Sequence, residues 1–386
     1  MPVESVFFLS EGKMNELRGQ TVTPHASTIA DGYIQKIKEI KAKNEWKQNG
    51  AGFMFMGGRL PTGDDAPAIP LITGIAPLPD GTLAYALATA DMSGIYIKDF
   101  TKPTEKDGYI LVKNGLRLFD LDAHNGRMTA TAADSHIERH IVVISPEHGT
   151  VSACTEGECF DANPRFSRKE ADVLLYDSCG HGYDSKMQFV RFGPKSIYRL
   201  HVATGDLEEV LEGGDYEYFR PYEAADGTLY CIRRPYRDKQ DGGMSFMDIL
   251  LFLPRVLKGL FGWLNFFTQR YAGETLKSSG ANPSKMQQKT QEELFVEGNL
   301  LEAEKNLKEN AARGEKNAGY APASWELVAK RPDGRLDVLR KGVLDYCIMA
   351  DGAAIISNGK HILQTGKDET LLGTAHLGVK LAVMPE

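Results

Sequence analysis

The chain has 386 residues, of which 42% are hydrophobic and 25% charged, as in an ordinary soluble globular protein with one large repeat domain or two ordinary domains. Its formal net charge of −7 gives no reason to expect nucleic-acid binding through a global positive field. The five cysteines include no C-x-x-C pair, which argues against a structural zinc site and favours reduced cysteines in a cytosolic protein.

The N-terminal segment predicts a hairpin followed by a helix. The first residues, MPVESVFFLSEGKMNELRG, lack a basic start, a long apolar core and a small-residue cleavage site, so we expect a β-hairpin over 3–18 instead of a signal peptide. Residues 31–46 place Ile34, Ile37 and Ile40 on one helical face with lysines opposite. We expect a surface helix that packs on the rim of the ring-shaped fold predicted below.

A short turn phrase recurs through the rest of the chain. Asp-Gly and Asn-Gly supply the positive φ angles of tight hairpin turns, so each copy between apolar runs predicts two antiparallel strands. Gly81 and Gly126 are 45 residues apart, as are Gly126 and Ala171, and alignment on the turns gives a four-strand unit. A four-strand period in the forties is typical of β-propeller blades, which stack around an axis to bury both faces. The copies include Pro79-Asp80-Gly81, Asp107-Gly108, Asn125-Gly126, Glu147-His148-Gly149, Thr204-Gly205, Asp226-Gly227, Asp333-Gly334 and Asp351-Gly352.

Two units carry a family resemblance. The segments NPRFSRKEADVLLYDS and SIYRLHVATGDLEEVLEGG resemble the TolB-like, WD40-like propeller repeat, which is also seen in the propeller domains of prolyl oligopeptidases. The resemblance covers roughly residues 71–375 and implies a fold more than a function. We expect an all-β propeller of about six four-stranded blades, with 3–18 and 379–384 joining both termini in one blade. A β-sandwich or an irregular multi-sheet protein is the alternative, although neither favours near-equal spacing.

The fourth unit is interrupted by an insertion. Residues 245–273 are dense in Phe, Leu, Ile and Trp, and Arg255 and Lys258 in the middle argue against a transmembrane span. An in-plane amphipathic membrane helix fits better, and burial against the ring, a second helix or another copy of the chain is the competing interpretation. We expect a polar helix over 282–319 to complete an inserted α-helical hairpin. The side chains expected to contact a membrane or partner are Phe246, Ile249, Leu250, Leu253, Leu257, Leu260, Phe261, Trp263, Leu264 and Phe267.

These elements divide the chain into four parts. Residues 1–70 hold the closing hairpin and the surface helix, and residues 71–235 hold the first propeller blades. Residues 236–323 are the inserted helical segment, and residues 324–386 hold the remaining blades and the ring closure.

Catalytic motifs are sparse in this sequence. It has no Gly-x-Ser-x-Gly nucleophile elbow, Walker loop or dinucleotide-binding glycine motif, and no α/β-hydrolase domain follows the blades. Long loops between second and third strands are expected on one face of the ring, where histidines and carboxylates could bind a metal and arginines an anion. The alternative is that these loop side chains form no site and are either solvated or hydrogen-bonded between blades. The candidate ligand-binding residues are His136, His140, His181, Asp184, Arg220, Arg233 and Arg234.

The sequence therefore favours a non-catalytic scaffold. We expect a cytoplasmic propeller, with a peripheral membrane location as an option, that binds a membrane surface or protein partner through residues 245–271 and could form a homo-oligomer. The alternative is a propeller enzyme, a lyase or hydrolase, with a polar His/Asp/Arg site at the mouth of the ring. We assign no metal, cofactor or nucleic acid; a metal site would require His136, His140 and His181 to lie within about 5 Å of a common point.

Overall fold

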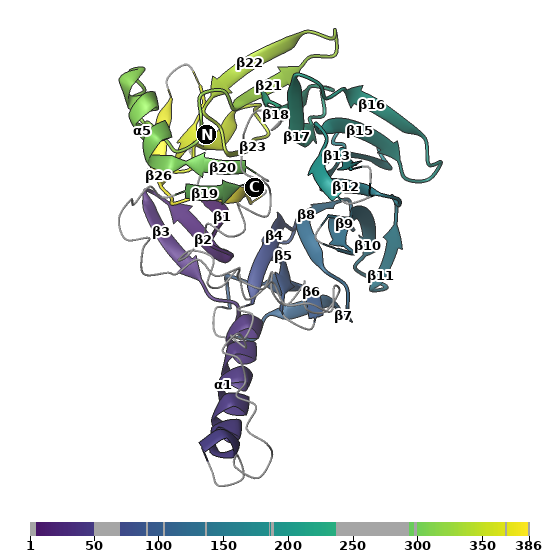
Figure 1. Cartoon of the computed structure of the whole chain (residues 1–386), viewed down its shortest axis with the longest axis vertical. Coiled ribbons are helices and arrows are strands. Elements are labelled where there is room, and N and C mark those ends of the chain that lie inside the picture. The colour runs from purple at the N-terminus through teal and green to yellow at the C-terminus, as the bar shows by residue number, and fades with distance from the viewer. Residues whose placement is uncertain are drawn as a thin grey trace.

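The structure, a computed structural model, is mostly β. Its antiparallel sheets are arranged around a common centre in a propeller-like ring, and the described residues include two helices (Figure 1). This confirms the all-β, propeller-like expectation. The structure describes residues 5–49, 70–236 and 293–384, apart from gaps at 90–91, 103–104, 136, 185, 187–188, 297–298 and 367–368.

Three of the sheets each consist of four antiparallel strands that follow one another in sequence order within the sheet. The first contains β4 (Leu71–Pro77), β5 (Leu83–Ala88), β6 (Met92–Lys98) and β7 (Gly108–Asn114). The second contains β17 (Tyr216–Glu223), β18 (Leu229–Pro235), β21 (Glu326–Lys330) and β22 (Leu336–Lys341). The third contains β23 (Asp345–Ile348), β24 (Ala354–Ser357), β25 (His361–Gln364) and β26 (Thr370–Thr374).

A nine-stranded sheet contains two further repeats. Its first half has β8 (Leu118–His124), β9 (Arg127–Ala133), β10 (Arg139–Ser145) and β11 (Thr150–Ala153). Its second half has β12 (Cys159–Phe166), β13 (Val173–Tyr183), β14 (Phe189–Phe192), β15 (Ser196–His201) and β16 (Leu207–Leu211). A parallel bridge between Arg139 of β10 and Phe160 of β12 joins the halves.

Both ends of the chain meet in one sheet, as expected from the sequence. Its order is β27 (Val379–Val383), β1 (Val6–Ser10), β2 (Lys13–Arg18) and β3 (Thr21–His25). The last strand pairs antiparallel with the first, with Val6 opposite Val383. This pairing closes the ring between segments far apart in the sequence (Figure 1).

Four copies of the Asp-Gly phrase build the same turn. In the turn between β4 and β5, the Asp80 carboxylate accepts a hydrogen bond from the backbone N of Thr82 at 3.0 Å, and Gly81 has a φ of 79°. Glycine adopts this left-handed conformation without the steric cost that a Cβ imposes. The same bond from residue i+2 recurs at Asp226, Asp333 and Asp351.

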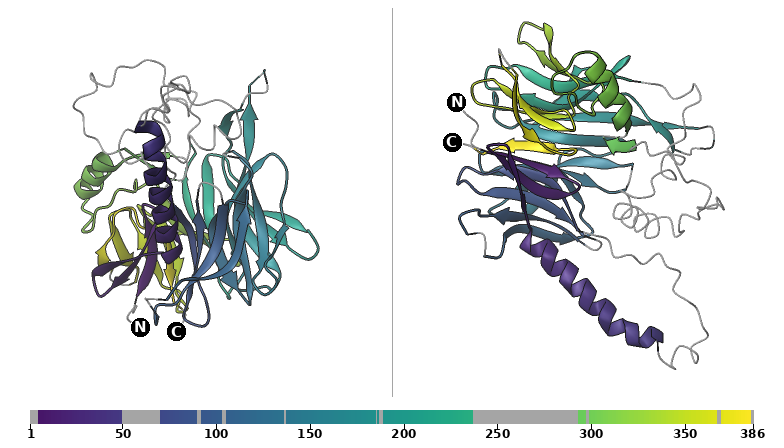
Figure 2. Two further views of the ribbon diagram at one scale, coloured as in Figure 1. Left: turned by 90° about the horizontal axis from the view of Figure 1, so that it is seen from below. Right: turned by 90° about the vertical axis from the view of Figure 1, so that its left-hand side faces the viewer.

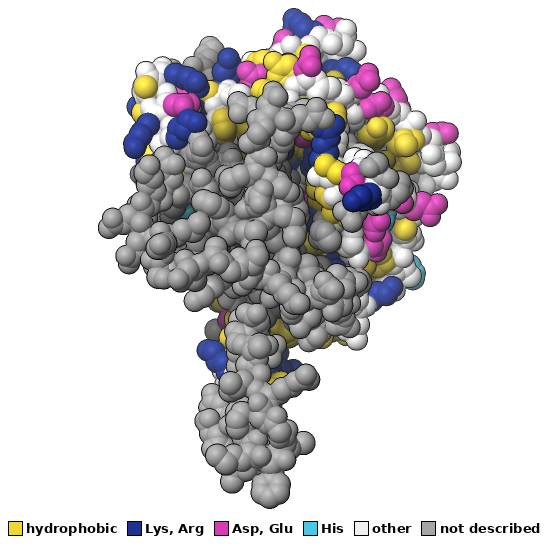
Figure 3. Space-filling view, viewed as in Figure 1, with side chains coloured by type: hydrophobic (Ala, Val, Ile, Leu, Met, Phe, Trp, Pro, Cys, Tyr) yellow, Lys and Arg dark blue, Asp and Glu magenta, His cyan; other side chains and the backbone are white. Residues whose placement is uncertain are grey.

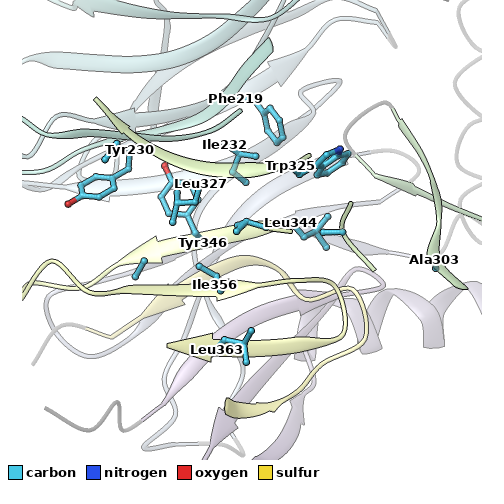
Figure 4. Close-up of a cluster of buried hydrophobic side chains, with 14 residues drawn as sticks. Phe219, Tyr230, Ile232, Ala303, Trp325, Leu327, Leu344, Tyr346, Ile356 and Leu363 are labelled. Carbon is cyan, nitrogen blue, oxygen red and sulfur yellow. The ribbon is translucent and has the colours of Figure 1, made fainter. Parts of the chain in front are cut away.

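The largest hydrophobic cluster lies between the sheets that contain β17 and β23 (Figure 4). Phe219 and Trp325 meet edge to face with ring centroids 6.0 Å apart, and Ile232, Leu344 and other apolar side chains fill the space around them. Burial of such side chains contributes about 1.5–3 kcal/mol each and holds neighbouring sheets together.

The N-terminal helix α1 (Thr28–Asn49) projects away from the sheets instead of packing along the rim, contrary to our expectation (Figures 1 and 2). Ile40 is 57% exposed. The start of the helix is anchored to the ring: the Thr28 N donates to the Asp107 carboxylate at 3.0 Å, which also accepts from the Tyr85 hydroxyl at 2.6 Å. The thin isoleucine stripe is too weak to hold the rest of the helix against a sheet.

The insertion enters after β18 and returns at β21, between the second and third strands of one sheet, as predicted. The expected polar helix over 282–319 is corrected: β19 (Glu293–Val296) and β20 (Asn299–Glu302) form an antiparallel pair, and α5 (Ala303–Ala312) follows. The dipeptide Gly298-Asn299 between apolar residues is a hairpin signal that our helical reading passed over.

The apolar segment 245–271 lies outside the described residues, with all ten of its predicted contact residues. Among the helices that the structure describes, none is both long and apolar enough to cross a membrane.

Candidate functional site

The centre of the ring holds a cavity of about 1020 Å³. Its lining comes from strands that are far apart in the sequence, namely β4, β8, β12, β17, β23 and β27. Turn residues such as Asp80 and Asn125 lie at one end, so the cavity reaches the face that carries the tight turns. Cavities of this size are typical of ligand-binding sites, and rigid strands hold their walls in place.

The strands that line the cavity are bent at equivalent places. Asp120, Asn163, Arg220 and Lys380 have positive φ angles of 48°, 52°, 57° and 55°. The strand ladders shift register at each of these positions, which is the pattern of a β-bulge. All four residues line the cavity. The bulges therefore bring polar side chains to the centre of the ring.

One half of the lining is tied together by Asp120 and Lys380. The Lys380 ammonium pairs with the Asp120 carboxylate and also donates to the Asn163 side-chain oxygen at 2.9 Å. The second Asp120 oxygen accepts from the Thr131 hydroxyl at 2.9 Å and from the Asn163 backbone at 3.1 Å. Residues 120 and 380 are 260 positions apart, and Lys380 belongs to the closing strand β27, so this pair also ties that strand to the ring.

A second part of the hydrogen-bond network is centred on Asp177, which is fully buried. Its carboxylate accepts from the Asn163 side chain at 2.8 Å, from the Lys195 ammonium at 2.7 Å and from the Arg220 backbone at 2.9 Å. The Arg220 guanidinium pairs with Asp345, whose carboxylate accepts from the Lys380 backbone. The linked residues form a closed circuit in the order Lys380, Asp120, Asn163, Asp177, Arg220 and Asp345.

Charge is balanced around this circuit once the Lys195 ammonium that pairs with Asp177 is counted, but it is not balanced beside the circuit. Asp122, which is buried, faces two guanidinium groups: Arg165 at 3.1 Å and Arg168 at 2.9 Å. Burial opposes ionisation of Asp122, but Arg168 and Arg165 outweigh it and hold the pKa of the carboxyl below its usual value. One carboxylate against two guanidinium groups makes the wall locally positive beside Asp122, whereas acidic and basic side chains are equal in number over the lining as a whole.

The positive charge of Arg168 also affects His124, which lines the cavity. Burial first, and then the charge of Arg168, lower the pKa of His124, which keeps the imidazole neutral near pH 7. Arg165 and Arg168 retain partial exposure, 28% and 21% of their side chains. Both arginines line the cavity, where a ligand would meet their side chains, and an oxyanion is the chemistry that a guanidinium fits; Arg168 also donates to the Phe166 carbonyl at 3.2 Å.

The predicted site residues are scattered. Arg220 lies in the cavity wall, although in a strand and not in a loop. Arg233 pairs with Glu326 at 2.5 Å, and the buried Arg234 pairs with Glu217 at 2.5 Å. Asp184 accepts from the backbone N of Lys186 at 2.8 Å.

The three predicted histidines are not gathered into one group of described residues. His136 lies outside the described residues. His181 packs edge to face on Phe189 and hydrogen-bonds the Ile137 carbonyl at 2.8 Å, whereas His140 faces Cys159 and Asp161. His181 therefore bonds to a neighbouring repeat, whereas Arg233 and Arg234 pair with glutamates of their own sheet.

Two of the bulges that line the cavity carry a readable signal in the sequence. Asn163-Pro164 and Arg220-Pro221 place proline inside predicted strands, which is tolerated mainly at edges and bulges. The paired charges of Asp122, Arg165 and Arg168 had no comparable signal, because their contacts span more than 40 residues of sequence.

Charge elsewhere on the described surface is less organised. Where Figure 3 colours the side chains by type, basic and acidic groups are interspersed along the edge of the ring. The surplus charge beside Asp122 is therefore a local feature of the cavity wall.

Comparison with known proteins supports the fold alone. No family model matches the sequence, and no curated protein matches it. The structure is similar to TolB from Acinetobacter baumannii, with 12% identity and a TM-score of 0.51 over 99% of this chain and 66% of that chain. This chain thus spans less than two thirds of that protein. The likeness establishes a structural resemblance to TolB-like β-propellers.

Two further similarities are weaker. A putative TolB from Agrobacterium tumefaciens aligns with 61% of this chain and 68% of its own, at 12% identity and a TM-score of 0.38. The tricorn protease aligns with 99% of this chain and 34% of its own, at 10% identity and a TM-score of 0.45.

Proposed function

We propose that this protein is a non-catalytic propeller of six four-stranded blades that binds an oxyanion-bearing ligand, a carboxylate or phosphate, in its axial cavity. The observation that carries the proposal is the group of Arg165, Arg168 and Asp122, in which two guanidinium forks share one buried carboxylate. Guanidinium groups bind carboxylate and phosphate oxygens in pairs, and a site closed off from bulk water strengthens such contacts.

A binding role is favoured over catalysis by the state of the cavity carboxylates. Asp120 and Asp345 pair with Lys380 and Arg220, and Asp122 has a lowered pKa. A general acid or base works best when its pKa lies near the working pH, and the lowered pKa of Asp122 moves that carboxyl further from this range. These groups suit charge recognition better than proton transfer.

Calorimetric titration with citrate tests this proposal. Arg168→Gln should weaken citrate binding by about tenfold or more, because a hydrogen bond to a charged group contributes about 1.5–3 kcal/mol. Arg165 remains to neutralise Asp122 in this variant, so the ring should stay folded. Arg168→Lys keeps the positive charge but loses the guanidinium fork, so its citrate affinity should lie between those of the wild type and Arg168→Gln.

The matched control is Arg335→Gln, whose side chain is 66% exposed and pairs with Asp337 in a turn. It should bind citrate as the wild type does. Equal losses in Arg335→Gln and Arg168→Gln, or wild-type affinity in Arg168→Gln, would overturn the assignment of the anion to the cavity.

We also propose, from the sequence, that residues 245–271 bind a membrane surface or a protein partner. Trp263 and several Phe and Leu residues form a wide apolar face, with Arg255, Lys258 and Arg270 among the polar positions. Apolar faces of this extent are rarely left without a contact. The surrounding sheet supplies a rigid frame, because the segment leaves it at β18 and rejoins it at β21.

A further inference from the structure

The parallel bridge between β10 and β12 creates a second polar site outside the axial cavity. Arg139 lies opposite Phe160 in this bridge. Successive side chains of a strand point to opposite faces, so His140 falls on the same side as Cys159 and Asp161, which flank Phe160. The bridge thus sets three potential metal ligands side by side.

The other face of the bridge is held firmly. The Arg139 guanidinium lies 4.4 Å from the ring centroid of Phe119 and 4.4 Å from that of Phe160. Contacts of this kind contribute about 0.5–2 kcal/mol each and fix the register of the bridge. The ligand-bearing face is therefore pre-arranged by packing that involves none of the three ligands.

The three side chains have the spacing of a coordination site. One ligand atom from each of His140, Cys159 and Asp161 lies within 4.8 Å of the others. The Cys159 sulfur is 3.8 Å from Nδ1 of His140. In tetrahedral zinc sites the bonds to sulfur and nitrogen are about 2.3 and 2.0 Å long, which separates two ligands by about 3.6 Å.

The imidazole is oriented by a carboxylate on its far side. Nε2 of His140 lies 3.2 Å from the Asp134 carboxylate, which leaves Nδ1 facing Cys159. Metal-binding histidines commonly hydrogen-bond a carboxylate through the other ring nitrogen, which fixes the tautomer and increases ligand basicity. The Asp161 side chain is similarly fixed, by the Thr155 hydroxyl at 2.5 Å.

We propose that His140, Cys159 and Asp161 bind a zinc ion whose fourth position opens into an adjoining cavity. This cavity has a volume of about 380 Å³ and is lined by Thr155, Tyr176 and Tyr198 in addition to two of the ligands. It shares no lining residue with the axial cavity. Zinc accepts mixed sulfur, nitrogen and oxygen ligands, whereas magnesium and calcium prefer oxygen alone.

Three protein ligands and one open position are the arrangement of a reactive or ligand-binding zinc site, in contrast to a closed structural site. The fourth position would take water or an anionic group small enough for the adjoining cavity. The zinc site is independent of oxyanion binding beside Asp122, so either proposal can fail without the other.

Titration of the apo-protein with cobalt(II) tests the site. One equivalent should produce a thiolate-to-cobalt charge-transfer band in the near ultraviolet and the intense visible bands of tetrahedral cobalt, and one equivalent of zinc should remove both. Cys159→Ser should abolish the charge-transfer band, and His140→Asn should abolish the tetrahedral visible bands. Asp134→Asn, which changes only the orienting carboxylate, should weaken cobalt affinity by about tenfold.

Cys154→Ser is the matched control, because Cys154 lines the same cavity but lies outside the three-ligand group. It should keep the full cobalt spectrum. If Cys159→Ser fails to fold, alkylation of the wild type replaces it: zinc should protect Cys159, and not Cys154, from iodoacetamide. The absence of a thiolate band in the wild type, its survival in folded Cys159→Ser, or unprotected Cys159 would each overturn the proposal.

Discussion

Asp177→Ala is expected to lower the free energy of unfolding by about 3–5 kcal/mol, the usual cost of removing one partner from a buried ion pair. The Asp177 carboxylate is fully buried and accepts hydrogen bonds from Lys195, Asn163 and Arg220. Its removal takes away the carboxylate that neutralises a buried ammonium group and cuts the closed circuit. Urea denaturation followed by circular dichroism measures the loss as a lower midpoint.

Three further variants distinguish the loss of the buried charge from the loss of stability that any aspartate substitution causes. Asp177→Asn keeps a hydrogen-bonding oxygen but not the charge, so it should cost less than Asp177→Ala. The double variant Asp177→Ala/Lys195→Met removes both charges and should recover part of the loss. Asp351→Ala, in an exposed turn, should cost about 1 kcal/mol or less. An Asp177→Ala protein as stable as Asp351→Ala would contradict a structural role for the circuit.

Deletion of residues 240–292, with a short Gly-Ser linker in their place, is expected to abolish membrane or partner binding and leave a folded ring. Burial of half a dozen large apolar side chains is worth on the order of 10 kcal/mol before ordering costs. The full chain should sediment with anionic vesicles or form oligomers in analytical ultracentrifugation, and the deleted chain should do neither.

The C-terminal boundary of the deletion follows from the helix α5. Ala303 belongs to the main hydrophobic cluster, and the buried Asn310 side chain donates to the carbonyls of Gly319 and Ala321 at 3.0 and 2.9 Å. A deletion that reached residue 320 would therefore damage the ring itself. In the full chain, Leu257→Ser/Leu260→Ser/Leu264→Ser should reproduce the loss, whereas Asn265→Ser should not. Unchanged sedimentation and oligomeric state in the folded deletion variant would leave the segment with no role in association.

The repeat architecture was predictable because its signals are local. Asp-Gly turns specify a left-handed backbone and a side-chain bond within three residues, and the structure places Gly126, Gly227 and Gly352 in that conformation. Helix α1 was also predictable from its periodicity, but its direction depends on the anchor at Asp107, which lies 79 residues beyond Thr28. Sequence patterns locate elements more readily than they orient them.

The cavity was less accessible to sequence analysis. Our prediction placed binding residues in long loops, whereas Asp122 and Arg165 lie on strands and Arg168 lies in the turn that follows β12. Lys380 and Asp120 are separated by 260 residues, so nothing local to either one indicates the contact. The potential zinc ligands were hidden for a similar reason: Cys159 and His140 are 19 residues apart and meet through a parallel bridge between two repeats.

Anomalous diffraction from a crystal soaked in selenate tests the proposed anion site most directly. Selenate is a tetrahedral oxyanion whose selenium can be located without ambiguity. We predict a selenium peak in the axial cavity, from a selenate ion whose oxygens lie within hydrogen-bond distance of the Arg165 and Arg168 guanidinium groups. Selenium peaks confined to exposed lysines and arginines of the outer surface, with none in the cavity at saturating selenate, would contradict it.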